Sequence, residues 1–213
     1  IIYLFNCSQG PMRESKVRQA INFAVDKVEI INSVLDGAAY LLRGFVSPLH
    51  FGFDPELKPF PHDPDRALQL LYEAGYGDGL EITMDTPTSS PAEALQVSEL
   101  IARQLAEVNI DTNVRITTDR AAYANNVRRK EIGDMCCFDS SPLSTYRVLR
   151  EKISSRFEGA WWQGYKNEEV DRLIEEGNGT IDGERREAIY RRCFRLIHED
   201  PPWLFLYNHE NAF

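Results

Sequence analysis

The sequence lacks the patterns that most membrane-spanning, metal-binding and disulfide-stabilised proteins carry. Its apolar runs are too short to cross a bilayer. Its four cysteines include no CxxC pair and are too sparse for a disulfide scaffold. Its four histidines show no HExxH or HxH spacing. We therefore expect no metal site, and no motif indicates a bound cofactor.

Positive charge is also scarce. The 24 lysines and arginines are outnumbered by 33 aspartates and glutamates, which gives a formal net charge of -9. Nucleic-acid binding relies on clustered basic side chains. The one basic cluster, Arg128–Lys130, is followed at once by Glu131, which is typical of a solvated helix end. We expect no nucleic-acid partner.

Catalytic motifs are missing as well. There is no GxSxG elbow, and the hydroxyls of Ser140, Ser141 and Ser144 are far in sequence from every histidine. The glycine string Gly75–Gly79 follows a predicted helix, whereas a phosphate-binding loop precedes one, so it indicates a helix end and a turn. One catalytic alternative stays open, a hydrolase using Asp139 with a nearby serine. It requires a histidine within hydrogen-bonding reach of Ser140 or Ser144.

What the chain does contain is a regular alternation of strand-like and helix-like segments. With 213 residues, 43% of them hydrophobic, it can bury a large core. The alternation predicts an α/β fold, a sheet with helices packed on its faces. Predicted strands lie at 1–7, 80–86, 108–118, 134–138 and 201–208, and predicted helices at 17–35, 63–74, 92–107, 119–129, 143–152, 168–177 and 183–199.

Residues 38–62 form a long segment in which this periodicity disappears. Four prolines, Pro48, Pro55, Pro59 and Pro61, interrupt it. We expect an irregular loop, and loops of this length are often functional or wrap a neighbouring lobe.

The adjacent thiols of Cys136 and Cys137 fall within a predicted strand. Successive side chains of a strand point to opposite faces, so these two cannot readily ligate one metal ion. We expect Cys7, Cys136, Cys137 and Cys193 to be buried thiols. A disulfide from Cys7 to one of the adjacent pair stays open.

The most promising candidate site lies just after the strand predicted at 134–138. Asp139 follows Phe138 at the carboxyl end of this strand, which is where ligands bind in α/β sheets. An ionised carboxylate there would suit a cationic group such as an ammonium. Ser141, with Pro142 after it, predicts the cap of the next helix. Asp139 capping that helix from one step upstream is the structural alternative.

Three aromatic residues add to this candidate site. Trp161, Trp162 and Tyr165 occupy a predicted loop between helices. Loop aromatics often contact ligands, although packing against the core is an equally good reading.

Six segments in order resemble the family 5 extracellular solute-binding proteins, which are the oligopeptide-, dipeptide- and nickel-binding components of ABC transporters. In the first segment the residues that carry the resemblance are Arg18, Ala20, Ile21, Ala24, Asp26 and Lys27. The six segments are RESKVRQAINFAVDKVEIINSVLDG, the proline-rich loop after it, HDPDRALQLLYEAGYGDGLEITM, NIDTNVRI, YKNEEVDRLI and REAIYRRCFRLIHEDPPWLFLYN.

The resemblance implies a receptor without catalytic activity. It would be periplasmic or extracellular after removal of a signal peptide, with membrane anchoring as a lipoprotein as one form. Two lobes would close around a peptide or similar small solute and deliver it to the permease subunits. Residues 1–213 look like the C-terminal lobe alone, a periplasmic-binding-protein-like α/β lobe with a mixed sheet, whose N-terminal lobe is missing.

The resemblance also gives Asp139 a role. It matches the position of an aspartate that pairs with the α-amino group of bound peptides. The family pattern D-x-x-D-P is one residue shorter here, with Ser141 in place of the second acid and Cys136 where a tryptophan is usual. A solute other than a peptide, with a cationic or polar end, is therefore compatible. Ligand-binding residues are predicted to be Phe138, Asp139, Trp161, Trp162 and Tyr165.

A non-catalytic interaction module is the remaining alternative. Its aromatic loop would dock a protein partner, which predicts a large apolar patch with no cleft facing it.

Overall fold

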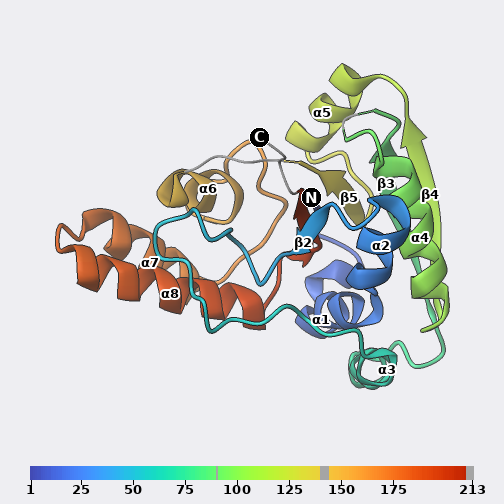
Figure 1. Cartoon of the computed structure of the whole chain (residues 1–213), viewed down its shortest axis with the longest axis horizontal. Helices are drawn as coiled ribbons and strands as arrows, with labels where there is room; N and C mark the ends of the chain where they lie inside the picture. Colours follow the sequence, from blue (N-terminus) through green and yellow to red (C-terminus); the bar gives the residue numbers. More distant parts are fainter. Residues whose placement is uncertain (90, 140–143, 210–213) are drawn as a thin grey trace.

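A mixed five-stranded sheet organises the computed structural model, which describes residues 1–89, 91–139 and 144–209 (Figure 1). The strand order is β4-β3-β5-β1-β6. Strand β3 pairs in parallel with β4 and β5, while β1 pairs antiparallel with β5 and β6. The strands are β1 Ile2–Phe5, β3 Leu80–Pro87, β4 Ile110–Thr117, β5 Met135–Phe138 and β6 Trp203–Phe205. The α/β prediction is confirmed.

Side chains of the central strands alternate between two hydrophobic cores. Tyr3 and Cys137 lie in the core on one face, and Leu4 and Cys136 lie in the core on the other. The prediction for the adjacent thiols is therefore confirmed. All four cysteines are free, Cys7 is half-buried, and the disulfide that the sequence left open does not form.

Each face of the sheet is covered by its own helices. The helices α1 Ser15–Ala24, α2 Lys27–Val34, α3 Pro64–Glu73 and α4 Ala94–Ala106, with the 3-10 turn Pro11–Arg13, contribute to the first core. The helices α5 Arg120–Arg128, α6 Thr145–Lys152, α7 Glu168–Gly179 and α8 Gly183–Glu199 contribute to the second core. Figure 1 shows α7 and α8 side by side, extending away from the sheet.

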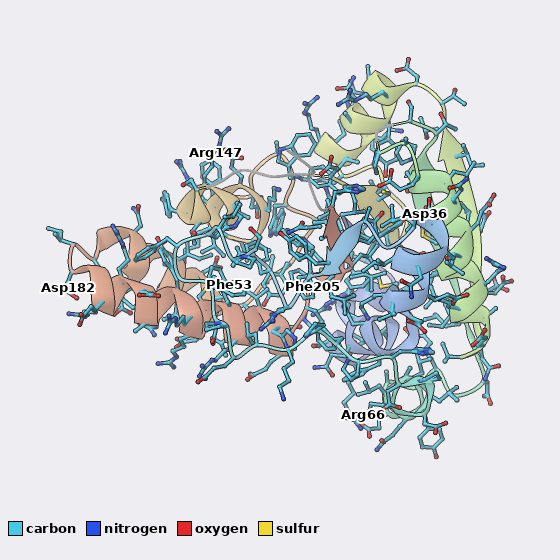
Figure 2. The ribbon with its side chains drawn as sticks, viewed as in Figure 1. Asp36, Phe53, Arg66, Arg147, Asp182 and Phe205 are labelled. Atoms are coloured by element: carbon cyan, nitrogen blue, oxygen red, sulfur yellow. The ribbon has the colours of Figure 1, made fainter. Side chains whose placement is uncertain are left out.

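Capping side chains set several of these helix starts. Asp63, Asn167 and Asp182 each accept a hydrogen bond from a backbone N–H in the first turn of α3, α7 and α8. Figure 2 shows Asp182 at the far tip of the α7–α8 pair, while Phe205 lies near the centre of the fold. After α3 the chain turns at Gly75, whose φ of 88° favours glycine, and enters β3, as the glycine string predicted.

Two helix predictions are wrong. The helix predicted over 17–35 is two helices, because Val25 and Asp26 adopt extended backbone angles. The Asp26 carboxylate accepts from the N–H groups of Val28 and Glu29 and so begins α2. Val28 in the first turn of α2 is 52% exposed, although its spacing continues the apolar pattern of the predicted helix.

The helix expected to open at Ser141 begins instead at Thr145. Its cap is Ser144, whose Oγ accepts from the N–H of Arg147. Ser141 and Pro142 lie outside the described residues.

The strand predicted over 201–208 belongs to two sheets. Its first part is β6, and its second part is β7 Tyr207–His209, which pairs antiparallel with β2 Ala39–Leu41. This short β2 is the one strand within the segment 38–62, which is otherwise irregular as predicted.

The charged residues that carried the family resemblance stabilise the fold. Arg18 is 4% exposed, and its guanidinium donates to the carbonyls of Pro201 (2.9 Å) and Met12 (2.6 Å) and pairs with Asp200. These contacts tie α1 to the segment that leads into β6. The motif therefore indicates a shared architecture rather than a binding site.

Candidate functional site

The candidate site lies at the carboxyl end of β5. Asp139 follows this strand and is exposed. Two cavities meet at this residue. We call them the Lys152 cavity, about 410 Å³, and the Trp161 cavity, about 610 Å³; Phe138 and Asp139 line both. Ligand sites of other proteins have volumes in this range.

The carboxylate of Asp139 has no hydrogen-bond or ion-pair partner among residues 1–89, 91–139 and 144–209. It therefore does not cap α6 through any described contact, because Ser144 supplies that cap. An exposed, ionised carboxylate between two cavities is available to a cationic group of a ligand.

Phe138 and Trp161 form one wall beside Asp139. Their ring centroids are 4.9 Å apart, and the guanidinium of Arg128 lies 4.8 Å from the centroid of the Trp161 ring. The ammonium of Lys130 donates to the carbonyl of Gly159 at 2.9 Å, which fixes the loop that carries Trp161 against the end of α5. The structure thus brings Phe138, Asp139 and Trp161 together.

Trp162 and Tyr165 lie elsewhere. The indole N–H of Trp162 donates to the carbonyl of Tyr165 at 2.7 Å, and Tyr165 is 3% exposed within the second core. Neither residue lines a cavity beside Asp139. Gly164 holds them there, because its φ is 86° and a Cβ would lie 2.5 Å from the backbone N of Ser8.

Sequence reasoning missed Lys152, which lies in the last turn of α6. The side chain is 3% exposed and lines the cavity named after it. Its ammonium lies 5.2 Å from the ring centroid of Phe138 and 5.8 Å from that of Trp203. Burial lowers the pKa of Lys152 to about 8, against the opposing effect of Glu151 and Asp139. The available signal was its spacing from buried Val148 and Leu149, which places Lys152 on the apolar stripe of α6.

The segment 38–62 contributes the opposite wall of the Lys152 cavity through residues such as Phe45 and His50. Phe45 stacks on Trp203 with centroids 4.4 Å apart. Ser47 Oγ and His50 Nδ1 lie 2.9 Å apart, a local contact within this loop. The hydroxyl of Ser144 has no histidine partner but caps α6, and Ser140 lies outside the described residues.

Other site types find no support in the part of the chain that the structure describes. It contains no group of three or more His, Cys, Asp or Glu side chains placed to hold a metal ion. It also contains no helix that is both long and apolar enough to cross a membrane. The aromatic loop expected of an interaction module instead borders a cavity.

Comparison with solved structures identifies the architecture as a lobe of a periplasmic binding protein. The chain superposes with a TM-score of 0.87 on the ABC transporter-associated periplasmic binding protein DppA of Helicobacter pylori, solved with the peptide STSA. The two share 23% sequence identity over 97% of this chain and 40% of that one. At this identity the likeness establishes the fold.

The sequence establishes the family. Residues 1–142 match the description "Bacterial extracellular solute-binding proteins, family 5 Middle", and the chain belongs to this family. It is 28% identical to heme-binding protein A of Haemophilus influenzae, covering 94% of this chain and 37% of that protein. It is 30% identical to the glutathione-binding protein GsiB of Pectobacterium atrosepticum, covering 94% of this chain and 40% of that protein.

The chain thus spans less than half the length of the relatives it matches. The family is described as extracellular solute-binding proteins, and these relatives are named as binding proteins rather than enzymes.

Proposed function

We propose that the chain is the C-terminal lobe of a two-lobed receptor that captures a peptide or similar small solute for an ABC importer. The second lobe would close over the end of β5, and the loaded receptor would dock on the permease subunits. We further propose that it performs no catalysis and that it acts in the periplasm or outside the cell, either free or anchored to the membrane as a lipoprotein. The family membership and the unpaired carboxylate of Asp139 between two cavities support this reading.

Within this function, Asp139 would hold a cationic group of the solute, and Phe138 and Trp161 would pack on its apolar part. Affinity in such a cleft comes from closure, which excludes water around a few placed polar groups. The isolated lobe would therefore bind weakly, because half of the contacting surface belongs to the other lobe. Trp162 and Tyr165, which line neither cavity, would have a structural role in this loop.

Calorimetric titration of the protein encoded by the complete reading frame, with a mixture of di- to pentapeptides, tests this function. We expect saturable binding, and Asp139→Asn should weaken it roughly tenfold to a hundredfold by removing a charge-assisted hydrogen bond. Asp65→Asn is the matched control, because Asp65 is exposed on α3 and lines neither cavity.

Binding that is unchanged in Asp139→Asn would remove this residue from the site. The absence of binding to any peptide would direct the search to other solutes with a cationic end.

A further inference from the structure

Lys152 presents a buried charge for which the described chain offers no counter-ion. Lys152 is almost completely buried, with an exposed fraction of 3%. The contacts of its ammonium within residues 1–89, 91–139 and 144–209 are the two aromatic rings of Phe138 and Trp203, and none is a hydrogen-bond acceptor. A buried ammonium normally has a paired anion or several acceptors, because its desolvation is costly.

The cavity in front of this ammonium has the character of a small-molecule site. It has an apolar part, which includes Leu42, Phe45, Val46 and Trp203, and a polar part, which includes Ser47, Asp139, Asn208 and His209. Its volume of about 410 Å³ lies within the range for ligand sites. A buried positive charge beside apolar side chains in this cavity favours an anionic group attached to an apolar body.

The charges around Lys152 leave room for such an anion. Glu151 precedes it on α6, and Asp139 lines the same cavity without forming an ion pair with the ammonium. His50 and His209 line the same cavity, and His209 pairs with Glu93 at 2.8 Å. Asp139 and Lys152 therefore offer opposite charges on one cavity wall.

We propose that the Lys152 ammonium binds a carboxylate of the captured solute inside the Lys152 cavity. This inference rests on the proposed function and adds the chemical class of the solute, a small carboxylic acid with an apolar group. Where the solute also carries an amine, the amine lies toward Asp139. Selection then depends on both ends of the solute.

The test uses side-chain NMR of the protein from the complete reading frame, labelled with ¹³C and ¹⁵N lysine. The signal of Lys152 is assigned by its loss in Lys152→Met. Three probes are titrated: alanyl-phenylalanine, its N-acetyl derivative, which keeps only the carboxylate, and its amide, which keeps only the amine. A carboxylate beside the ammonium favours the charged form. Both acids should therefore raise the pKa of Lys152, and the amide should not.

Affinity provides the second readout. Lys152→Met should weaken the two acids roughly tenfold to a hundredfold and leave the amide unchanged, whereas Lys152→Arg should keep part of the affinity. Lys166→Met, at an exposed position outside the cavity, is the matched control.

A Lys152 signal that responds to neither acid overturns the inference, and binding of the peptide mixture would then leave the proposed function standing. If Lys152 responds to the N-acetyl derivative while neither alanyl-phenylalanine nor the peptide mixture binds, peptide capture fails and the carboxylate site remains. A pKa of Lys152 that falls in Asp139→Asn without any probe, with no response to the acids, identifies Asp139 as the counter-ion and also overturns the inference.

Discussion

Lys27 on α2 and Lys152 on α6 are both almost completely buried, with exposed fractions of 4% and 3%. Burial lowers the pKa of Lys27 to about 7 and that of Lys152 to about 8. Both also border a cavity. Burial, charge and cavity lining therefore do not distinguish the two lysines.

Hydrogen bonding does distinguish them. The Lys27 amine donates to the carbonyls of Asn22 (2.5 Å) and Val25 (3.0 Å) at the end of α1 and to the carbonyl of Phe60 (3.5 Å) in the segment 38–62. It thus satisfies carbonyls that the end of a helix leaves without partners. Lys152 contacts only aromatic rings within the part of the chain that is described. The difference teaches that Lys27 stabilises the fold, whereas the partner of Lys152 comes from outside these residues.

Replacing Lys27 tests the first half of this comparison and has the largest expected effect. Lys27→Met keeps the length of the side chain but leaves buried carbonyls without a donor, which costs about 1–3 kcal/mol per group. We expect the free energy of unfolding to fall by roughly 2–3 kcal/mol, since relief of the buried charge offsets part of the loss. Urea unfolding followed by tryptophan fluorescence measures it.

An unchanged unfolding midpoint in Lys27→Met would break the comparison, because it would mean that the three carbonyl contacts contribute nothing. Lys16→Met is a suitable control. Lys16 forms an exposed pair with Glu73, and exposed pairs contribute little.

Replacing Lys152 tests the second half and should change stability in the opposite direction. Lys152→Met removes a desolvated charge and keeps the packing on Phe138 and Trp203, so we expect a gain of roughly 1–2 kcal/mol at neutral pH. Burial moves the pKa of Lys152 from 10.5 down to about 8. Between these values the unfolded chain binds more protons, so the wild-type free energy of unfolding rises with pH.

The advantage of Lys152→Met should therefore shrink by about 1 kcal/mol between pH 8 and pH 9. Burial raises the pKa of the Cys137 thiol to about 12 and opposes this trend, but both proteins contain that thiol. Urea unfolding at the two pH values measures the difference. A loss of stability in Lys152→Met at neutral pH would assign Lys152 to the fold.

The sequence predicted the features that local rules decide. The glycine string that begins at Gly75 ends α3 and leads into β3, and Cys136 and Cys137 face opposite cores. Ligands of α/β sheets bind at the carboxyl ends of strands, and this rule pointed to Asp139, which lines two cavities in the structure. Each of these predictions depends on residues within a few positions of one another.

Features that depend on distant contacts could not be predicted. Lys152 is buried by Trp203, from a strand about fifty positions away, and by the loop that contains Phe45. The positions of Trp162 and Tyr165 depend on the close approach of Gly164 to Ser8. The break between α1 and α2 was missed because the apolar spacing continues across it, while the capping bond of Asp26 interrupts the helix.

Removing the cap of α6 has the smallest expected effect. It bears on the comparison of the two lysines because α6 carries Lys152, which lines the cavity. Figure 2 shows Arg147 projecting outward from this helix, away from the core, while Lys152 is buried. Ser144→Ala removes an acceptor for the N–H of Arg147, and the 3.4 Å separation indicates a weak bond. We expect the free energy of unfolding, measured with urea, to fall by about 0.5–1 kcal/mol.

Ser33→Ala, at an exposed position within α2, is the control. Its free energy of unfolding should instead rise by a few tenths of a kcal/mol, since alanine has the higher helix propensity. If Ser144→Ala weakens binding of the carboxylate probes as well as stability, the orientation of α6 governs the Lys152 subsite. If stability alone falls, the packing of Lys152 between Phe138 and Trp203 holds its ammonium in place.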